Sequence, residues 1–375
     1  MSGQSEKKKG IIMSKLNIAF TGNVFPFGEG FAYGGERILY YLIRELSKLG
    51  HNIYLFSREG TNVPSKYIKD YVPIGELQND VDLHYEAVVE YVNRTKTEFD
   101  IYMCNYFGDG WNPDVIDNFN YVELVWCVWC HIRWNMNKLP FNTITYSRVL
   151  QQDFARLGLP TSMIHYGIPK EDYVPCYEPD DYAVWIGKIE GGKAPHLAIE
   201  TAKKAGMKIV IMGPPYNSGC FWEKVYPYID NKDVFWVRGV DDAMKQKIMS
   251  MAKVFISSND NTWKEHFGIV NAESLAMGTP VLAFNKRNQD CAVVVDQIVK
   301  DMKTGFILNY MDSNNVDEIT SDGANMLKNL KYIDRRDCRK EFEERFTSEL
   351  MAKRYDWFFD KVKEGERFNT VEVPF

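Results

Sequence analysis

The chain has 375 residues, of which 45% are hydrophobic, 26% are charged and 14% are aromatic. This composition excludes a disordered chain, a collagen and a coiled coil, and the length predicts two globular domains. The 45 basic and 51 acidic residues give a net charge of -6. Neither half of the chain is a basic arm, so the sequence carries no strong signal of nucleic-acid binding.

Residues 1–14 begin with a lysine-rich stretch but lack the long apolar segment of a signal peptide. The chain contains no apolar run of about 20 residues, the length that a membrane-spanning helix requires. The seven cysteines are scattered, which favours reduced thiols over a disulfide framework. We therefore expect a flexible extension over residues 1–14 of a cytoplasmic protein, for which peripheral membrane contact stays open.

Short β-rich runs alternate with helical patterns in both halves of the chain, which is typical of βαβ units. In the first half, the runs are 16–21, 52–56 and 100–104, and a helix begins near residue 36 and ends before Gly50. In the second half, the runs are 182–186, 208–212, 233–237, 253–257 and 280–284. The pattern predicts an α/β fold with two Rossmann-like, doubly wound domains that face each other across a cleft.

A segment rich in proline and acidic residues, 167–180, predicts a linker between the domains. We expect an N-terminal domain over 15–172, a C-terminal domain over 173–350 and a helix over 351–375. Ligands of such sheets bind beyond the carboxyl ends of the strands. The loops after the runs 16–21 and 182–186 are therefore the expected binding loops.

A glycine-rich loop follows the first run and leads into the helix near residue 36. Gly34 and Gly35 lie where backbone N–H groups can approach a phosphate at a helix N-terminus. The glycine spacing does not fit the dinucleotide fingerprint, so a nicotinamide-dependent enzyme is not expected.

The segment 263–284 carries two carboxylates at a suggestive spacing. Glu265 precedes a turn, and Glu273 follows eight positions later in a helix that begins near Phe267 or Gly268. The N-terminus of that helix offers N–H groups and a positive dipole to a phosphate. A carboxylate on its first turns can accept hydrogen bonds from two ribose hydroxyls.

This segment resembles the acidic motif of glycosyltransferase family 4, whose members are retaining, nucleotide-sugar-dependent enzymes of GT-B fold. Four more segments resemble that family in the same order along the chain: 33–57, 165–175, 183–206 and 301–308. Together the segments span most of residues 16–310. The chain departs from the family at Tyr166, where many members have asparagine.

The resemblance implies that Lys188 and Lys193 bind the diphosphate of the donor, together with the backbone at Gly34 and Gly35. Lys188 stands where the family usually has arginine. Two cations can offset the charge on a departing diphosphate, so no cofactor and no metal are expected.

The resemblance assigns binding of the donor sugar and of the ribose to the segment 263–284. Glu265 would hold hydroxyls of the sugar, and Glu273 would hold those of the ribose. Phe267, Gly268 and Ile269 would present backbone N–H groups to the sugar or the phosphate.

His131 falls where the family has a histidine near the transferring sugar, and we expect it to act in catalysis with Glu265 and Lys193. The same stretch matches a haem-attachment pattern, Cys127 to His131, which we set aside because haem attachment needs export. The D-x-D sequence at 80–82 is interpreted as a solvated acidic turn.

The resemblance thus implies a transferase that moves a hexose from a nucleoside-diphosphate sugar, for example of UDP or GDP, to a hydroxyl acceptor with retention. The terminal helix would return to the N-terminal domain. Two alternatives stay open. One is an epimerase or hydrolase of nucleotide sugars with the same fold, and the other is a non-catalytic subunit that binds them.

Overall fold

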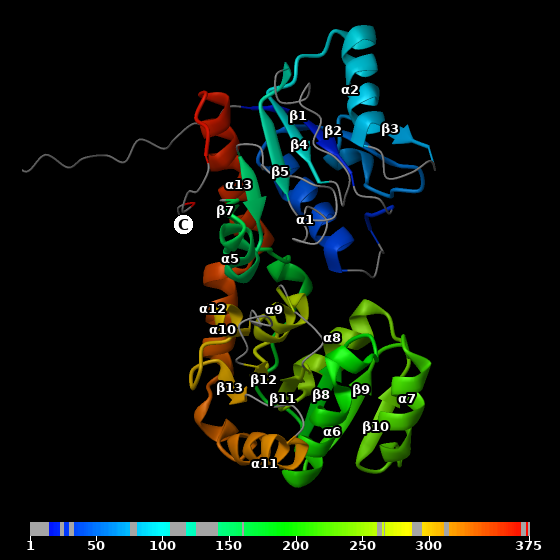
Figure 1. The fold of residues 1–375 in the computed structure, drawn as a ribbon, viewed down its shortest axis with the longest axis vertical. Helices are drawn as coiled ribbons and strands as arrows, with labels where there is room; N and C mark the ends of the chain where they lie inside the picture. The colour runs from blue at the N-terminus through cyan, green and yellow to red at the C-terminus, as the bar shows by residue number, and fades with distance from the viewer. Residues whose placement is uncertain are drawn as a thin grey trace, which may run out of the picture. The chain divides into compact units, whose positions relative to one another are not determined.

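The computed structural model describes residues 15–22, 26–29, 34–75, 81–105, 118–124, 142–159, 161–260, 265, 267–286, 295–310, 315–368 and 373. These residues form two compact units and two sheets (Figure 1), and the strand β7 (Ser162–Met163) of the second unit belongs to the first sheet. The first unit contains the described residues up to Ile144 and those from Ala352 onward, and the second unit is Thr145–Met351.

In the first unit, parallel strands alternate with helices. The elements are β1 (Asn17–Thr21), α1 (Gly34–Lys48), β2 (Asn52–Arg58), the short helix η1 (Ser65–Tyr67), β3 (Asp70–Ile74), α2 (Val81–Thr95), β4 (Ile101–Cys104), β5 (Tyr121–Leu124) and β6 (Thr143–Thr145). The predicted strands at 16–21, 52–56 and 100–104 and the helix near residue 36 are confirmed. The apolar face of α1 is buried, as its periodicity predicts.

The second unit repeats this alternation. Its elements are α5 (Arg148–Arg156), β7 (Ser162–Met163), η2 (Lys170–Asp172), β8 (Tyr182–Ile186), η3 (Gly191–Lys193), α6 (Pro195–Lys204), β9 (Lys208–Met212), α7 (Ser218–Lys224), η4 (Tyr226–Tyr228), β10 (Val234–Val237), α8 (Asp242–Met251), β11 (Val254–Ser257), α9 (Ile269–Ala276), β12 (Val281–Lys286), α10 (Val295–Ile298), β13 (Gly305–Tyr310), α11 (Val316–Leu327), η5 (Leu330–Tyr332) and α12 (Arg335–Arg345). All five strands predicted in this half are confirmed. A last helix, α13 (Ser348–Lys363), follows.

Within the described residues, seven strands form the first sheet in the order β3-β2-β1-β4-β5-β6-β7. Six form the second, in the order β10-β9-β8-β11-β12-β13. The pairs from β3 to β6 and from β10 to β13 are parallel. In each sheet the direction of winding reverses once, between β1 and β4 and between β8 and β11. This is the doubly wound order of Rossmann-like domains, which confirms the predicted α/β fold.

The central strands of the second sheet are buried, as expected for a parallel sheet whose faces are covered by helices. All four residues of β11 are buried, and so are the three central residues of β8. The helices α6 and α11 lie side by side in this unit (Figure 1). Lys204 of α6 donates a hydrogen bond of 2.6 Å to Asp317 of α11.

The last helix is tied into the first unit by a buried histidine and a buried aspartate. His51, which precedes β2, has its Nε2 atom 2.9 Å from Oδ1 of Asp356 on α13. The Nδ1 atom of the same ring accepts the backbone N–H of Leu16 at 3.2 Å. Nδ1 is therefore a hydrogen-bond acceptor here, and Nε2 is the ring nitrogen next to the carboxylate.

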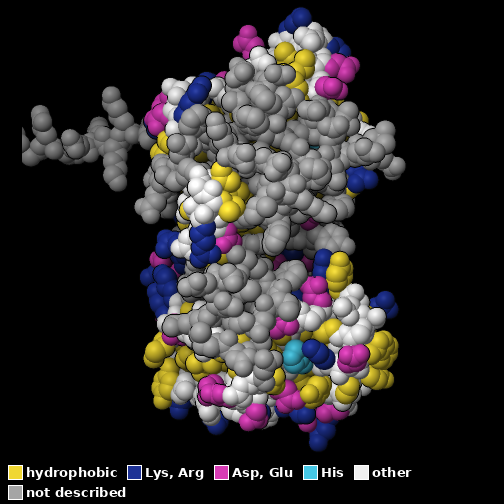
Figure 2. Space-filling model, in the orientation of Figure 1, with side chains coloured by type: hydrophobic (Ala, Val, Ile, Leu, Met, Phe, Trp, Pro, Cys, Tyr) yellow, Lys and Arg dark blue, Asp and Glu magenta, His cyan; other side chains and the backbone are white. Residues whose placement is uncertain are grey.

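Over the described part of the face shown in Figure 2, basic and acidic side chains are interspersed. This distribution agrees with the near balance of charges in the sequence. Among the described residues, no helix has the length and apolar character needed to cross a bilayer.

Candidate functional site

The candidate site lies in the second unit at the carboxyl edge of the sheet, where β8 and β11 are neighbours. Loops that leave such a switch point diverge to opposite faces of the sheet, which leaves a crevice for a ligand. The loop after β8 carries Lys188 and Lys193, and Glu265 follows β11 in the chain. The fold thus brings together residues that the sequence analysis named from separate segments.

Hydrogen bonds join the loop after β8 to the residues that follow β11. Ser258, which follows β11, donates through Oγ to the backbone oxygens of Ala194 at 2.8 Å and Lys193 at 3.1 Å. Its Oγ also accepts the indole N–H of Trp185 at 3.0 Å. The N–H of Asp260 donates to the oxygen of Gly192 at 2.9 Å. The Lys193 backbone is therefore held against the end of β11.

Lys193 and Glu265 form an ion pair and a hydrogen bond between Nζ and Oε2. The two side chains are 21% and 20% exposed, so water reaches both. An ion pair that is open to water contributes about 0–1 kcal/mol and exchanges partners readily. An incoming anion can therefore compete for the Lys193 ammonium.

Phe267 anchors the loop between Glu265 and α9. Its side chain is buried and packs against Tyr166, His165 and Phe346, with ring centroids 5.3, 6.0 and 6.0 Å away. The side chain of Phe267 thus packs in the interior, and the Phe267 backbone lies two residues before the first residue of α9. Tyr166, the departure from the family pattern, is part of this aromatic cluster and also stacks on Tyr146 at 4.2 Å.

Gly268 is the N-cap residue of α9 and has a φ of 70°. That backbone conformation is strained for residues with a Cβ atom. A Cβ on Gly268 would also lie 2.5 Å from Nδ2 of Asn271 and 3.2 Å from Cγ of Glu265. The helix then starts at Ile269, so the backbone that the sequence analysis assigned to anion binding does open a helix.

Glu273 lies one turn further along α9, and its side chain is only 4% exposed. Its Oε1 atom accepts a hydrogen bond of 2.8 Å from the Tyr173 hydroxyl and one of 2.9 Å from Lys245 Nζ on α8. Sequence reasoning missed both partners. Lys245 lies outside the segments that resemble the family, and Tyr173 lies in the segment 165–175 but was given no role there. Only the tertiary structure brings them to Glu273.

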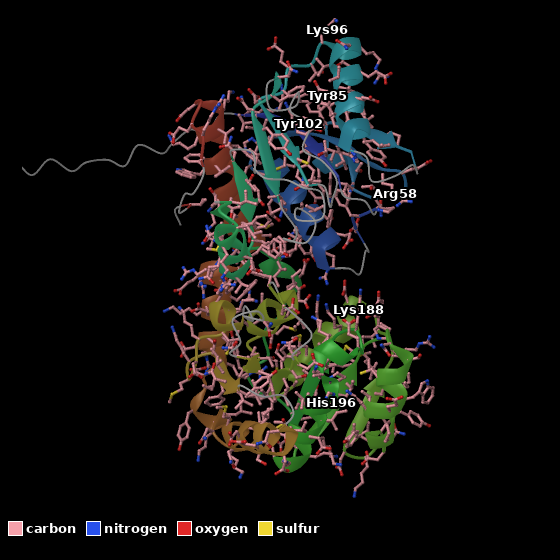
Figure 3. The ribbon with its side chains drawn as sticks, in the orientation of Figure 1. Arg58, Tyr85, Lys96, Tyr102, Lys188 and His196 are labelled. Atoms are coloured by element: carbon pink, nitrogen blue, oxygen red, sulfur yellow. The ribbon has the colours of Figure 1, made fainter. Side chains whose placement is uncertain are left out.

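Lys188 follows the end of β8 and lies at the end of the second unit that is away from α11 (Figure 3). Its ammonium sits over the Tyr216 ring, 4.7 Å from the centroid. Such a contact orients the charge while leaving N–H donors on the ammonium to other groups. Tyr216 belongs to the loop after β9 and is 67% exposed.

His196 lies on the first turn of α6, three residues after Lys193 (Figure 3). Burial lowers the pKa of His196 below its usual value, and the positive charge of Lys224 lowers it further, against the opposing effects of Asp260 and Glu200. The ring is therefore neutral at pH 7. The sequence analysis assigned it no role.

Gly34 and Gly35 open α1 in the first unit, at a helix N-terminus as expected. His131, Cys127, Cys130 and Asp80 lie outside the described residues. Within the described residues, no group of three or more His, Cys, Asp and Glu side chains is placed to hold a metal ion.

The second unit matches a known protein family, and the chain resembles solved structures. Residues 174–345 match the family model described as glycosyl transferases group 1. No curated protein sequence matches the chain. The chain is similar in structure to AviGT4, a glycosyltransferase of avilamycin A biosynthesis, with a TM-score of 0.69 and 16% identity over 94% of this chain and 99% of that one.

Two other solved structures extend the comparison. Sucrose-phosphate synthase from Thermosynechococcus elongatus has a TM-score of 0.67 and 16% identity, covering 94% of this chain and all of its own. Anabaena HepE in complex with UDP and glucose has a TM-score of 0.62 and 13% identity, with coverages of 92% and 100%. The fold is that of the GT-B glycosyltransferases. The family match covers the GT-B unit that holds Lys188, Lys193, Glu265 and Glu273, and it supports a glycosyltransferase.

Proposed function

We propose that this chain is a retaining glycosyltransferase that moves a sugar from a nucleoside-diphosphate sugar to a hydroxyl acceptor. One observation carries the proposal. Lys193 and Glu265 pair at the switch point of the second sheet, beside the N-terminus of α9 and inside the segment that matches the family model. Cations, a carboxylate and helix N–H groups at one crevice are what a diphosphate linked to a sugar requires.

The phosphate end of the donor would bind Lys188 and Lys193. Departure of the diphosphate places negative charge on its oxygens, and preorganised cations stabilise that charge in the transition state. Because the lysines supply this charge, we expect transfer without an added divalent metal. The backbone N–H groups at Gly268 and Ile269 would add the positive end of the α9 dipole.

The sugar end would bind Glu265 and the ribose would bind Glu273. Glu273 is held by Tyr173 and Lys245 through Oε1, so its carboxylate is fixed before a ligand arrives. Fixed acceptors align the donor without a further entropy cost. We assign no side chain as a covalent nucleophile, and attack from the face of the leaving group is the proposed route to retention. The resemblance also assigns roles to Gly34, Gly35 and His131.

The test is calorimetric titration with UDP, GDP, ADP and dTDP sugars in the presence of EDTA, alongside an assay for diphosphate release. UDP sugars come first, because UDP and glucose are bound in the HepE structure. If Lys193 supplies about 3 kcal/mol to the transition state, Lys193→Ala lowers transfer about a hundredfold. Lys253→Ala is the matched control, since Lys253 pairs with the exposed Asp181 instead.

The outcomes separate the open alternatives. One preferred donor and a product whose anomeric configuration matches that donor in the NMR spectrum support retaining transfer. Release of free or isomerised sugar with every acceptor would instead identify a hydrolase or an epimerase. Tight binding without any turnover would identify a non-catalytic subunit, and normal turnover by Lys193→Ala would refute the assignment of that lysine.

A further inference from the structure

Asn271, on the first turn of α9, is a buried amide without a hydrogen bond. The residue is 1% exposed, and neither Oδ1 nor Nδ2 has a partner among the described residues. Burying an unsatisfied amide destabilises a fold, whereas an apolar side chain of similar size would be tolerated. Stability therefore does not explain why asparagine stands at this position.

The amide lies against the functional loop. The point that a Cβ of Gly268 would occupy is 2.5 Å from Nδ2 of Asn271 and 3.6 Å from Cδ of Glu265. The amide nitrogen and the Glu265 side chain thus both lie near the same point beside Gly268. A polar side chain at this helical position can cap the N-cap residue, but the Asn271 amide makes no such bond with any described residue.

The Glu265 carboxylate pairs with Lys193 in this structure. A bound diphosphate would compete for Lys193, because it brings more negative charge than one carboxylate does. A carboxylate that loses its cation in a partly buried place needs another donor to remain ionised. The N–H groups of the Asn271 amide are neutral donors that lie beside Gly268, near the Glu265 side chain.

We propose that Asn271 is a positioning residue for Glu265, an inference that rests on the proposed function. When the diphosphate engages Lys193, Nδ2 of Asn271 donates to the Glu265 carboxylate and holds it toward the hydroxyls of the donor sugar. A neutral amide serves this purpose better than a cation, because it leaves the negative charge available to the sugar. The Asn271 amide then supplies the donor to which the Glu265 carboxylate turns when Lys193 binds the diphosphate.

The experiment uses the full chain with Asn271→Leu and Asn271→Asp. Leucine has similar volume and removes the buried amide, so we expect a higher midpoint of thermal unfolding. We also expect kcat to fall about 10- to 100-fold, the effect of one hydrogen bond to a charged group, while the Kd for the nucleoside diphosphate alone stays unchanged. Aspartate keeps the shape but replaces the donor by a second carboxylate, so kcat falls at least as far.

Two comparisons distinguish positioning from packing. In the double variant with Glu265→Gln, Asn271→Leu should lower kcat no further than Glu265→Gln does alone, because Asn271 acts through Glu265. Ser274→Ala is the control on the same helix, since the buried Ser274 hydroxyl bonds only within its own turn region, to the oxygen of Thr279 at 2.8 Å, and kcat should stay unchanged.

A lower unfolding midpoint for Asn271→Leu, or an unchanged kcat, would overturn the assignment of Asn271. Additive losses in the double variant would overturn it as well. The proposed function fails separately, when the wild-type chain binds none of the four nucleoside diphosphates, and the assignment of Asn271 then falls with it.

Discussion

Removal of the Lys245 charge by Lys245→Met tests whether burial gives an ion pair its effect on stability. Lys245 and Glu273 are 14% and 4% exposed and 2.9 Å apart. At an effective dielectric constant of about 20, two charges at that separation attract by about 6 kcal/mol, most of which the cost of desolvation offsets. Methionine keeps the length of the side chain and leaves the Glu273 carboxylate without this cation.

Breaking a buried pair by removing one partner costs about 3–5 kcal/mol, and we take the lower value because Tyr173 still donates to Glu273. For a domain of about 150–250 residues, each kcal/mol lowers the melting temperature by about 2–4 °C. The melting temperature of the second unit should therefore fall by about 6–12 °C in Lys245→Met, as measured by calorimetry of the full chain.

The control is Lys253→Met. Lys253 and Asp181 are closer, at 2.6 Å, but are 41% and 80% exposed. An exposed pair contributes about 0–1 kcal/mol, so the melting temperature should change by less than about 4 °C. If Lys253→Met destabilised the chain as much as Lys245→Met does, separation rather than burial would control these pairs and the reasoning would be wrong.

Three further changes probe other parts of the structure. His51→Ala should cost the first unit about 3–5 kcal/mol in urea unfolding, because it isolates the buried Asp356 carboxylate; an unchanged urea midpoint would contradict the pairing. Burial raises the pKa of Glu341, but hydrogen bonds from Lys300 and Arg345 lower it more, leaving it below its usual value. The ionised Glu341 carboxylate therefore contributes fully to the free energy of unfolding above its usual pKa, and this contribution is lost as the pH falls through its lowered pKa. In Glu341→Gln, this part of the loss of stability in acid should be absent. Gly213→Ala should unfold the second unit at lower temperature, because φ is 145° and a Cβ would lie 1.8 Å from the oxygen of Gly187; a wild-type melting temperature would count against this contact.

The strands of the second sheet could be predicted because each is a short run of apolar residues between turn signals. The strand β3 could not, because its sequence, Asp70–Ile74, includes a proline and little apolar patterning. It lies at the edge of the first sheet, where proline is tolerated because one side of the strand needs no partner. Edge position is a property of the whole sheet, so no local pattern reveals it.

Sequence reasoning named single residues of the candidate site but not the contacts between them. The sequence named Lys193 and Glu265 for separate roles, whereas the structure pairs them across 72 positions of the chain. Lys245 lies outside the segments that resemble the family, and Asn271 lies in the segment 263–284 but was given no role there. What distinguishes them is burial and the identity of their neighbours, which only the folded chain determines.

Two of the lysine–glutamate pairs in the second unit, Lys193–Glu265 and Lys245–Glu273, differ in how far they are exposed to water. Lys193 and Glu265 are each about one-fifth exposed, so water screens their attraction and a diphosphate can displace one partner at small cost. Lys245 and Glu273 are largely buried, so displacement would remove a partner from a charge that water reaches poorly. Under the proposed function, the ribose would bind at the buried pair and the diphosphate would be released from the exposed pair. Substitutions at the first pair should therefore change turnover more than stability, and substitutions at Lys245 should change stability first.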